Sequence, residues 1–128
     1  MKKTMEPQQS NNQLPTVTID STYKLIRIHK NTLSYLDNPD YIQLLVNPEQ
    51  KTLVICKSKP KNPTALRVKY QQSNGKSYEL YSTTLVDELL SFHTLESLHG
   101  HIRLHGAYIK RFDIVVFHLE DKTSHEEK

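Results

Sequence analysis

The sequence predicts an α+β fold that is mostly β and consists of two tandem β-β-α-β-β units. Several short segments alternate apolar and polar residues, which is typical of half-buried strands. Two other segments space their apolar residues by three or four, as on one face of a helix. The same order of strand and helix patterns occurs twice in the 128 residues, so we expect an internal repeat.

The first unit, residues 14–58, is expected to begin with a hairpin and continue into a helix. Residues 17–19 and 23–28 have strand patterns, and the polar residues 20–22 between them suit a turn. Leucines three residues apart predict the short helix that follows. They are Leu33 and Leu36.

Residues at both ends of this helix have identifiable roles. Asn31 or Thr32 is expected to cap its first amide groups. Asn38 should end it, because a residue that precedes a proline avoids helical geometry.

A second hairpin should close the unit. Residues 40–46 and 51–57 have strand patterns, and Pro48 suits the type I turn between them. Alternation puts apolar side chains on one side of each strand: Ile42, Leu44 and Val46 on the first, Val54 and Cys56 on the second. We therefore expect the Cys56 thiol to be buried and inert.

The second unit, residues 64–119, is expected to repeat this order. Residues 65–70 and 77–81 flank Asn74-Gly75, the strongest hairpin signal in the chain, because both turn residues tolerate positive φ. An amphipathic helix should follow, capped by Ser82, Thr83 or Thr84, with one apolar face formed by Leu85, Val86, Leu89, Leu90 and Phe92. Residues 101–109 and 113–119 should form the last hairpin.

Three polar segments lie outside the two units. Residues 1–13 are expected to be a disordered arm, and residues 120–128 a charged tail. Residues 59–63 contain two prolines and two lysines and are expected to be a linker.

Charge is distributed unevenly along the chain. Residues 20–77 hold ten Lys or Arg and four acids, or +6, whereas residues 78–128 hold five and nine, or −4. With +1 from the first nineteen residues, the total is +3. A basic front half can meet an anionic partner. Solvated charges without any partner explain the same count.

Cysteine usage and hydropathy favour a soluble cytoplasmic protein. Cys56 is the only cysteine, so no intrachain disulfide can form and a reducing compartment is expected. The first residues lack the apolar run of a signal peptide. No apolar stretch approaches the roughly 20 residues that span a bilayer, so no membrane association is expected.

The run LIRIHKNTLSYLDNPDYIQLLVNPEQKTLVICK resembles the AbrB/MazE/MraZ swapped-hairpin superfamily of bacterial DNA-binding proteins. The likeness covers residues 16–120. In that family, two units of strand, brief helix and hairpin interleave into a barrel-like body. Most members do this as dimers, whereas the MraZ branch carries both units in one chain, as the pattern here implies. The phrase YIQLLVNPE also resembles proteins of Firmicute mobile elements, which implies no function.

The resemblance implies that basic residues near the strand-to-helix edges contact DNA phosphates. The matching residues are Lys24, Arg27, Lys30, Arg67, Lys69 and Lys76. Base readout would need neighbours that reach a groove, such as His29, Asn31 or Gln72. The helices depart from the family, because they carry Ser34, Tyr35, Asp87 and Glu88 where basic residues are usual. The alternative is that these basic residues are only the solvated faces of half-buried strands.

Neither a metal site nor an enzyme is expected. Four histidines lie close in sequence, at positions 93, 99, 101 and 105, but no Cys or carboxylate cluster completes a ligand set around them. The chain has no HExxH, GxSxG or glycine-rich phosphate loop. We therefore expect no cofactor.

The sequence thus favours a small DNA-binding regulator. The alternative is a protein-interaction module, or an inhibitor of a host protein, encoded on a phage, plasmid or other mobile element. The acidic pair Asp87 and Glu88 and the acidic tail indicate this second function. Assembly into a homo-oligomer is compatible with both.

Overall fold

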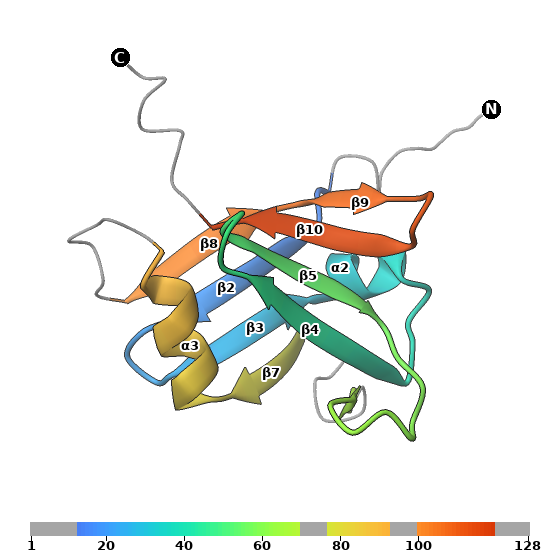
Figure 1. The fold of residues 1–128 in the computed structure, drawn as a ribbon, viewed down its shortest axis with the longest axis horizontal. Helices are drawn as coiled ribbons and strands as arrows, with labels where there is room; N and C mark the ends of the chain where they lie inside the picture. Colours follow the sequence, from blue (N-terminus) through green and yellow to red (C-terminus); the bar gives the residue numbers. More distant parts are fainter. Residues whose placement is uncertain (1–12, 70–76, 93–99, 120–128) are drawn as a thin grey trace, which may run out of the picture.

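Two antiparallel β-sheets form the body of the protein (Figure 1). The computed structural model describes residues 13–69, 77–92 and 100–119. The first sheet has the strand order β7-β3-β2-β8, and its strands are β2 (Thr16–Asp20), β3 (Leu25–His29), β7 (Ser77–Tyr81) and β8 (His101–His105). The second has the order β6-β4-β5-β10-β9, and its strands are β4 (Tyr41–Asn47), β5 (Thr52–Lys57), β6 (Leu66–Arg67), β9 (Ala107–Ile109) and β10 (Ile114–His118).

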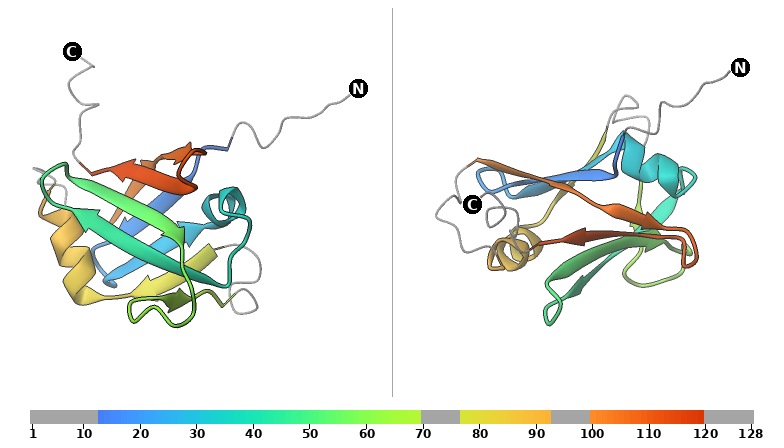
Figure 2. Two further views of the ribbon diagram at one scale, coloured as in Figure 1. Left: turned by 45° about the vertical axis from the view of Figure 1, so that its right-hand side comes forward. Right: turned by 90° about the horizontal axis from the view of Figure 1, so that it is seen from above.

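The two sheets lie face to face, and the two helices of the described residues lie at opposite ends of the body (Figures 1 and 2). The helices are α2 (Lys30–Tyr35) and α3 (Thr83–Leu90). Alternate residues of each strand point into the space between the sheets and form one core with the helices. Its most deeply buried members are Val17, Ile19, Ile26, Ile28, Leu36, Ile42, Leu53, Ile55, Val86, Leu89, Val115, Phe117 and Leu119.

The predicted order of the first unit is confirmed. β2 and β3 form the first hairpin, α2 follows directly, and β4 and β5 form the second hairpin. The Asp20 carboxylate stabilises the first turn, because its Oδ1 accepts hydrogen bonds from the amides of Thr22 (2.8 Å) and Tyr23 (2.9 Å).

The predicted helix cap is wrong. The N-cap residue is His29, which makes no side-chain capping bond, because β3 runs straight into α2. The Thr32 hydroxyl instead holds the start of β2: it donates to the Thr16 carbonyl (2.8 Å) and accepts from the Thr16 amide (2.7 Å). The Asn31 side-chain amide donates to the Leu14 carbonyl.

The predicted burial of Cys56 is also wrong. Leu53 and Ile55 are the buried apolar residues of β5, whereas Val54 and Cys56 lie on the outer face of the sheet and are only half-buried. An apolar run on both faces of a strand does not reveal which face meets the core.

The predicted Asn-Gly hairpin is not formed by the strands it was expected to join. β6 pairs with β4, and β7 pairs with β3, so they belong to different sheets. Asn74-Gly75 itself lies outside the described residues. β6 and β7 each pair with a strand of the first half instead of with each other.

The last predicted hairpin is confirmed only in part. β9 pairs with β10, but β8 leaves to pair with β2 in the first sheet. The strand breaks at Gly106, where an added Cβ would lie 2.5 Å from the Val116 carbonyl oxygen and 2.7 Å from Phe117 Cδ2. Glycine is needed there because the chain passes so close to β10 as it changes sheet.

The predicted helix is confirmed as α3, with the Ser82 hydroxyl as its N-cap acceptor.

The two halves pair their strands differently. The first half forms two hairpins on its own, whereas β6, β7 and β8 each pair with a strand of the first half. β3 and β7 are antiparallel neighbours, and each leads into a helix. The described residues show neither a closed barrel nor two interleaved units. None of the helices in these residues is long and apolar enough to cross a membrane.

Candidate nucleic-acid interface

The outer face of the first sheet is polar and carries several cationic groups. Residues alternate on each strand, so most of the apolar residues enter the core, and the polar residues lie on the other face together with Leu25. Register places Arg27 and Arg103 on either side of Thr18, on β3 and β8. We call this surface the polar face; its central residues are Thr16, Thr18, Asp20, Arg27, His29, His101, Arg103 and His105.

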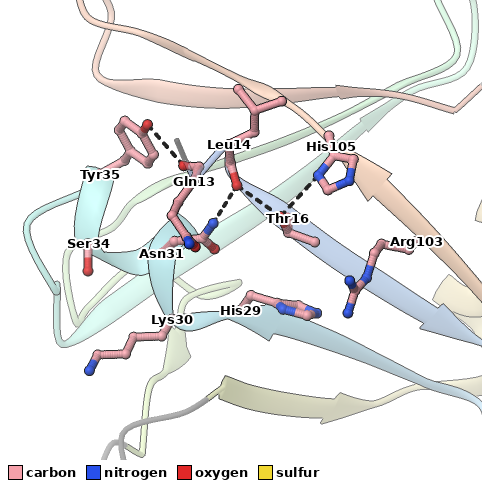
Figure 3. A pocket seen from close by; sticks show the side chains of 10 residues that line it. All are labelled: Gln13, Leu14, Thr16, His29, Lys30, Asn31, Ser34, Tyr35, Arg103 and His105. Carbon is pink, nitrogen blue, oxygen red and sulfur yellow. Dashed lines mark hydrogen bonds between the residues drawn. The ribbon is translucent and has the colours of Figure 1, made fainter. Parts of the chain in front are cut away.

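A pocket of about 690 Å³ lies at one end of the polar face, beside α2 (Figure 3). The segment before β2, the end of β3, α2 and β8 form its walls. Four lining residues are basic or titratable: His29, Lys30, Arg103 and His105. The others are neutral: Gln13, Leu14, Thr16, Asn31, Ser34 and Tyr35.

Hydrogen bonds assign the proton of His105. The Thr16 hydroxyl has a single proton and donates it to the Leu14 carbonyl at 2.9 Å. Its contact with His105 Nδ1 at 3.2 Å must therefore be one in which the ring N–H donates. In the neutral ring, Nε2 of His105 is then the acceptor that is left for a ligand.

His29 lies on the other side of β2. Its Nε2 is 2.9 Å from the Thr18 hydroxyl. Burial of the ring, and then the charges of Arg103 and Arg27, hold the pKa of His29 below its ordinary value. His29 is therefore largely neutral at pH 7, and Lys30 and Arg103 supply the permanent positive charge of the pocket.

Neither of these two cations is neutralised by a carboxylate within the part of the chain that the structure describes. The ten lining residues include no Asp or Glu. By contrast, the Lys24 ammonium lies 2.6 Å from the Asp87 carboxylate, and Arg27 Nε lies 2.9 Å from that of Glu79. The pocket is therefore the place on this face where positive charge is available to an anion.

The structure distributes the six predicted phosphate-binding residues over several places. Lys24 and Arg27 belong to ion pairs on the first sheet, and Lys30 lies at the pocket. Arg67 lies on β6 in the second sheet, and Lys69 follows it; both are exposed. Lys76 lies outside the described residues.

The sequence identified only part of the pocket. His29 and Asn31 were expected to read bases, and both line the pocket, whereas Gln72 lies outside the described residues. Arg103 was not expected to bind a ligand, and His105 was considered only as a metal ligand. The alternation of residues 101–105 indicates that they share a face, but only the pairing of β8 with β2 brings them to His29.

The histidines do not converge on a metal within the described residues. His101 and His105 point outward from β8, and His93 and His99 lie outside the described ranges. No group of three His, Cys, Asp or Glu there is arranged to hold an ion. His101 Nε2 instead lies 3.8 Å from the buried carboxylate of Asp20.

No protein-family model, curated protein or solved structure matches this chain. The chemistry of the pocket and the polar face is therefore the basis for assigning a function.

Proposed function

We propose that the protein is a small DNA-binding regulator that contacts phosphates at the pocket end of the polar face. The observation that supports this proposal is that Arg103 and Lys30, neither paired with a described carboxylate, both line a hollow whose ten lining residues include no acid. The regulatory role rests on the resemblance to the swapped-hairpin family.

The chemistry of these side chains suits phosphate. The guanidinium of Arg103 can donate two parallel hydrogen bonds to two phosphate oxygens, and the Lys30 ammonium acts as a mobile point charge. His105 Nε2 adds a third polar group, which becomes a donor when the ring is protonated. Contacts of this kind position a protein on a nucleic acid without reading its sequence.

Fluorescence anisotropy of a labelled duplex, titrated at several salt concentrations, tests the proposal. Replacing Arg103 by Ala should weaken binding about tenfold and lower the slope of log K against log salt by about one, because one phosphate contact is lost. Lys30→Ala should act in the same direction.

The pair Lys24–Asp87 offers a matched control. Lys24→Gln combined with Asp87→Asn removes a cation and leaves the net charge unchanged, and it should leave the affinity within about twofold, since that ammonium is already neutralised. Absence of any binding at low ionic strength would overturn the proposal, because phosphate-driven affinity is greatest there.

A second candidate function, docking on another protein, is favoured by the outer face of the second sheet. Leu45, Val54, Val116 and Ala107 are paired in one row across β4, β5, β10 and β9. Leu45 is 45% exposed. The acidic pair Asp87 and Glu88 on α3 supports this second function less than expected, because the Asp87 carboxylate is already paired with the Lys24 ammonium.

Comparison of the wild-type protein with Leu45→Lys in a nuclease-treated lysate tests this second function. A protein that the wild type captures and the variant does not would support docking at this row, since a charge there opposes apolar contact. Equal capture by both would count against it.

A further inference from the structure

The pocket is larger than a contact with one phosphate requires. Its volume of about 690 Å³ falls within the range of small-molecule sites in proteins. The phosphates of a duplex lie on its outside, with the bases stacked and paired within, so a duplex would touch the rim and leave the hollow unfilled. A hollow of this size beside a phosphate-binding edge suits a whole nucleotide.

The two sides of the pocket differ in chemistry (Figure 3). Arg103 and His105 lie on β8 at one side, and Asn31 and Ser34 lie on α2 at the other. The first side is basic. The second carries amide and hydroxyl groups that can donate or accept hydrogen bonds, with the Lys30 ammonium at its edge. A ligand that combines an anionic end with a neutral, hydrogen-bonding end matches both sides.

Asn31 provides a specific indication of the neutral end. Its Nδ2 donates to the Leu14 carbonyl, which determines the orientation of the amide, and its Oδ1 is buried without a hydrogen-bond partner in the described structure. A buried acceptor in this condition is destabilising until a donor reaches it. The side chain of Leu14, which also lines the pocket, is 55% exposed and can turn away without breaking the hydrogen bonds of the Leu14 carbonyl.

We propose that the pocket binds one unpaired nucleotide of a single strand, with its phosphate on Arg103 and an N–H of its base on Asn31 Oδ1. This inference rests on the proposed function and specifies the ligand of the same site. In a duplex the ring N–H groups of the bases, such as thymine N3–H, are engaged in pairing inside the stack. A single strand presents them freely, so the protein should prefer single-stranded over double-stranded nucleic acid.

Anisotropy with a labelled oligothymidylate, its duplex with oligoadenylate and the matching oligouridylate tests the inference. The thymine N3–H is the donor that Asn31 would accept. We expect the single strand to bind at least about tenfold more tightly than the duplex, which corresponds to one well-placed base contact. The RNA strand shows which sugar the pocket favours. Tight binding of either single strand supports the proposal that the pocket binds an unpaired nucleotide.

Two variants separate the inference from the proposed function. Asn31→Ala should weaken single-strand binding about tenfold and duplex binding far less, whereas Arg103→Ala should weaken both. Equal affinity for the two forms, unaffected by Asn31→Ala, would overturn the nucleotide pocket and leave the phosphate-binding function standing. Binding of neither form would overturn both.

A titration of the wild-type protein keeps the test independent of how the Asn31 variant folds. Thymidine monophosphate should shift the side-chain amide resonances of Asn31 and the ring resonances of His105 in NMR spectra, and inorganic phosphate should shift only the latter. Identical shifts with both ligands would contradict a base-binding side of the pocket.

Discussion

At the scale of single residues, the start of β2 depends on one hydroxyl group. Thr32 is fully buried, and its Oγ1 bonds both the amide and the carbonyl of Thr16. The Thr16 hydroxyl in turn is hydrogen-bonded to the Leu14 carbonyl and to His105 Nδ1. Stability and the shape of the pocket are therefore linked through the same two threonines.

Thr32→Val is expected to lower the free energy of unfolding by about 2 kcal/mol, because it keeps the side-chain volume and leaves two buried backbone groups of Thr16 without a partner. Urea denaturation with an unchanged m-value measures this loss. Thr22→Val, at an exposed turn position, is the matched control and should change stability by less than about 0.5 kcal/mol. Equal effects of both substitutions would contradict the assigned role of Thr32.

His29, which lines the pocket, should make the stability of the protein depend on pH. Because the pKa of His29 is lower in the folded protein, the unfolded chain binds protons more readily, and stability is fully present above the unfolded pKa of about 6.5. This contribution to stability is lost as the pH falls from about 6.5 through the pKa that His29 has in the folded protein. The wild type should therefore lose stability between about pH 7 and pH 5, and His29→Gln should lose less. Parallel denaturation curves for the two proteins over this window would contradict the prediction.

At the scale of elements, the hairpins that the sequence predicted correctly are the ones closed by local turns. β2–β3 and β4–β5 each join adjacent strands whose patterns and turn residues agree. The strands β6, β7 and β8 were placed wrongly because their partners are distant in sequence. Alternation identifies a strand and its two faces, but carries no information on which strand lies beside it.

The bend between β8 and β9 depends on Gly106. Gly106→Ala should lower the free energy of unfolding by about 3 kcal/mol, because its Cβ would overlap the Val116 carbonyl and the Phe117 ring. Gly100→Ala is the comparison: it has open space around it but a φ of +80°, and it should lose about 1 kcal/mol through backbone strain alone. Thermal or urea denaturation distinguishes the two, and a larger loss at Gly100 would contradict the close approach at Gly106.

At the scale of the whole molecule, strands from both halves of the chain complete each sheet. β7 and β8 flank the hairpin β2–β3, and β10 pairs with β5. The buried residues of α3 belong to the same core. The two sheets are therefore one cooperative structure rather than two joined units.

A fragment of residues 1–58 is expected not to fold, although it contains all of the predicted first unit. Without β7, β8 and β10 it exposes strand edges and the apolar faces that they cover. NMR amide dispersion and urea denaturation of this fragment provide the measurement. A dispersed spectrum with a cooperative transition would instead show that the first unit is stable by itself.

The sequence by itself determined the mostly β class, the positions of both helices and the two hairpins of the first half, because these depend on periodicity and on turn residues close together in the chain. It also identified His29, Lys30 and Asn31 as polar residues at a strand-to-helix edge. Only the tertiary structure decided that Arg103 and His105 stand beside them and that Lys24 and Arg27 are neutralised by partners. The reason is physical: an electrostatic site depends on which charges are adjacent in space, and pairing between strands far apart in sequence determines this.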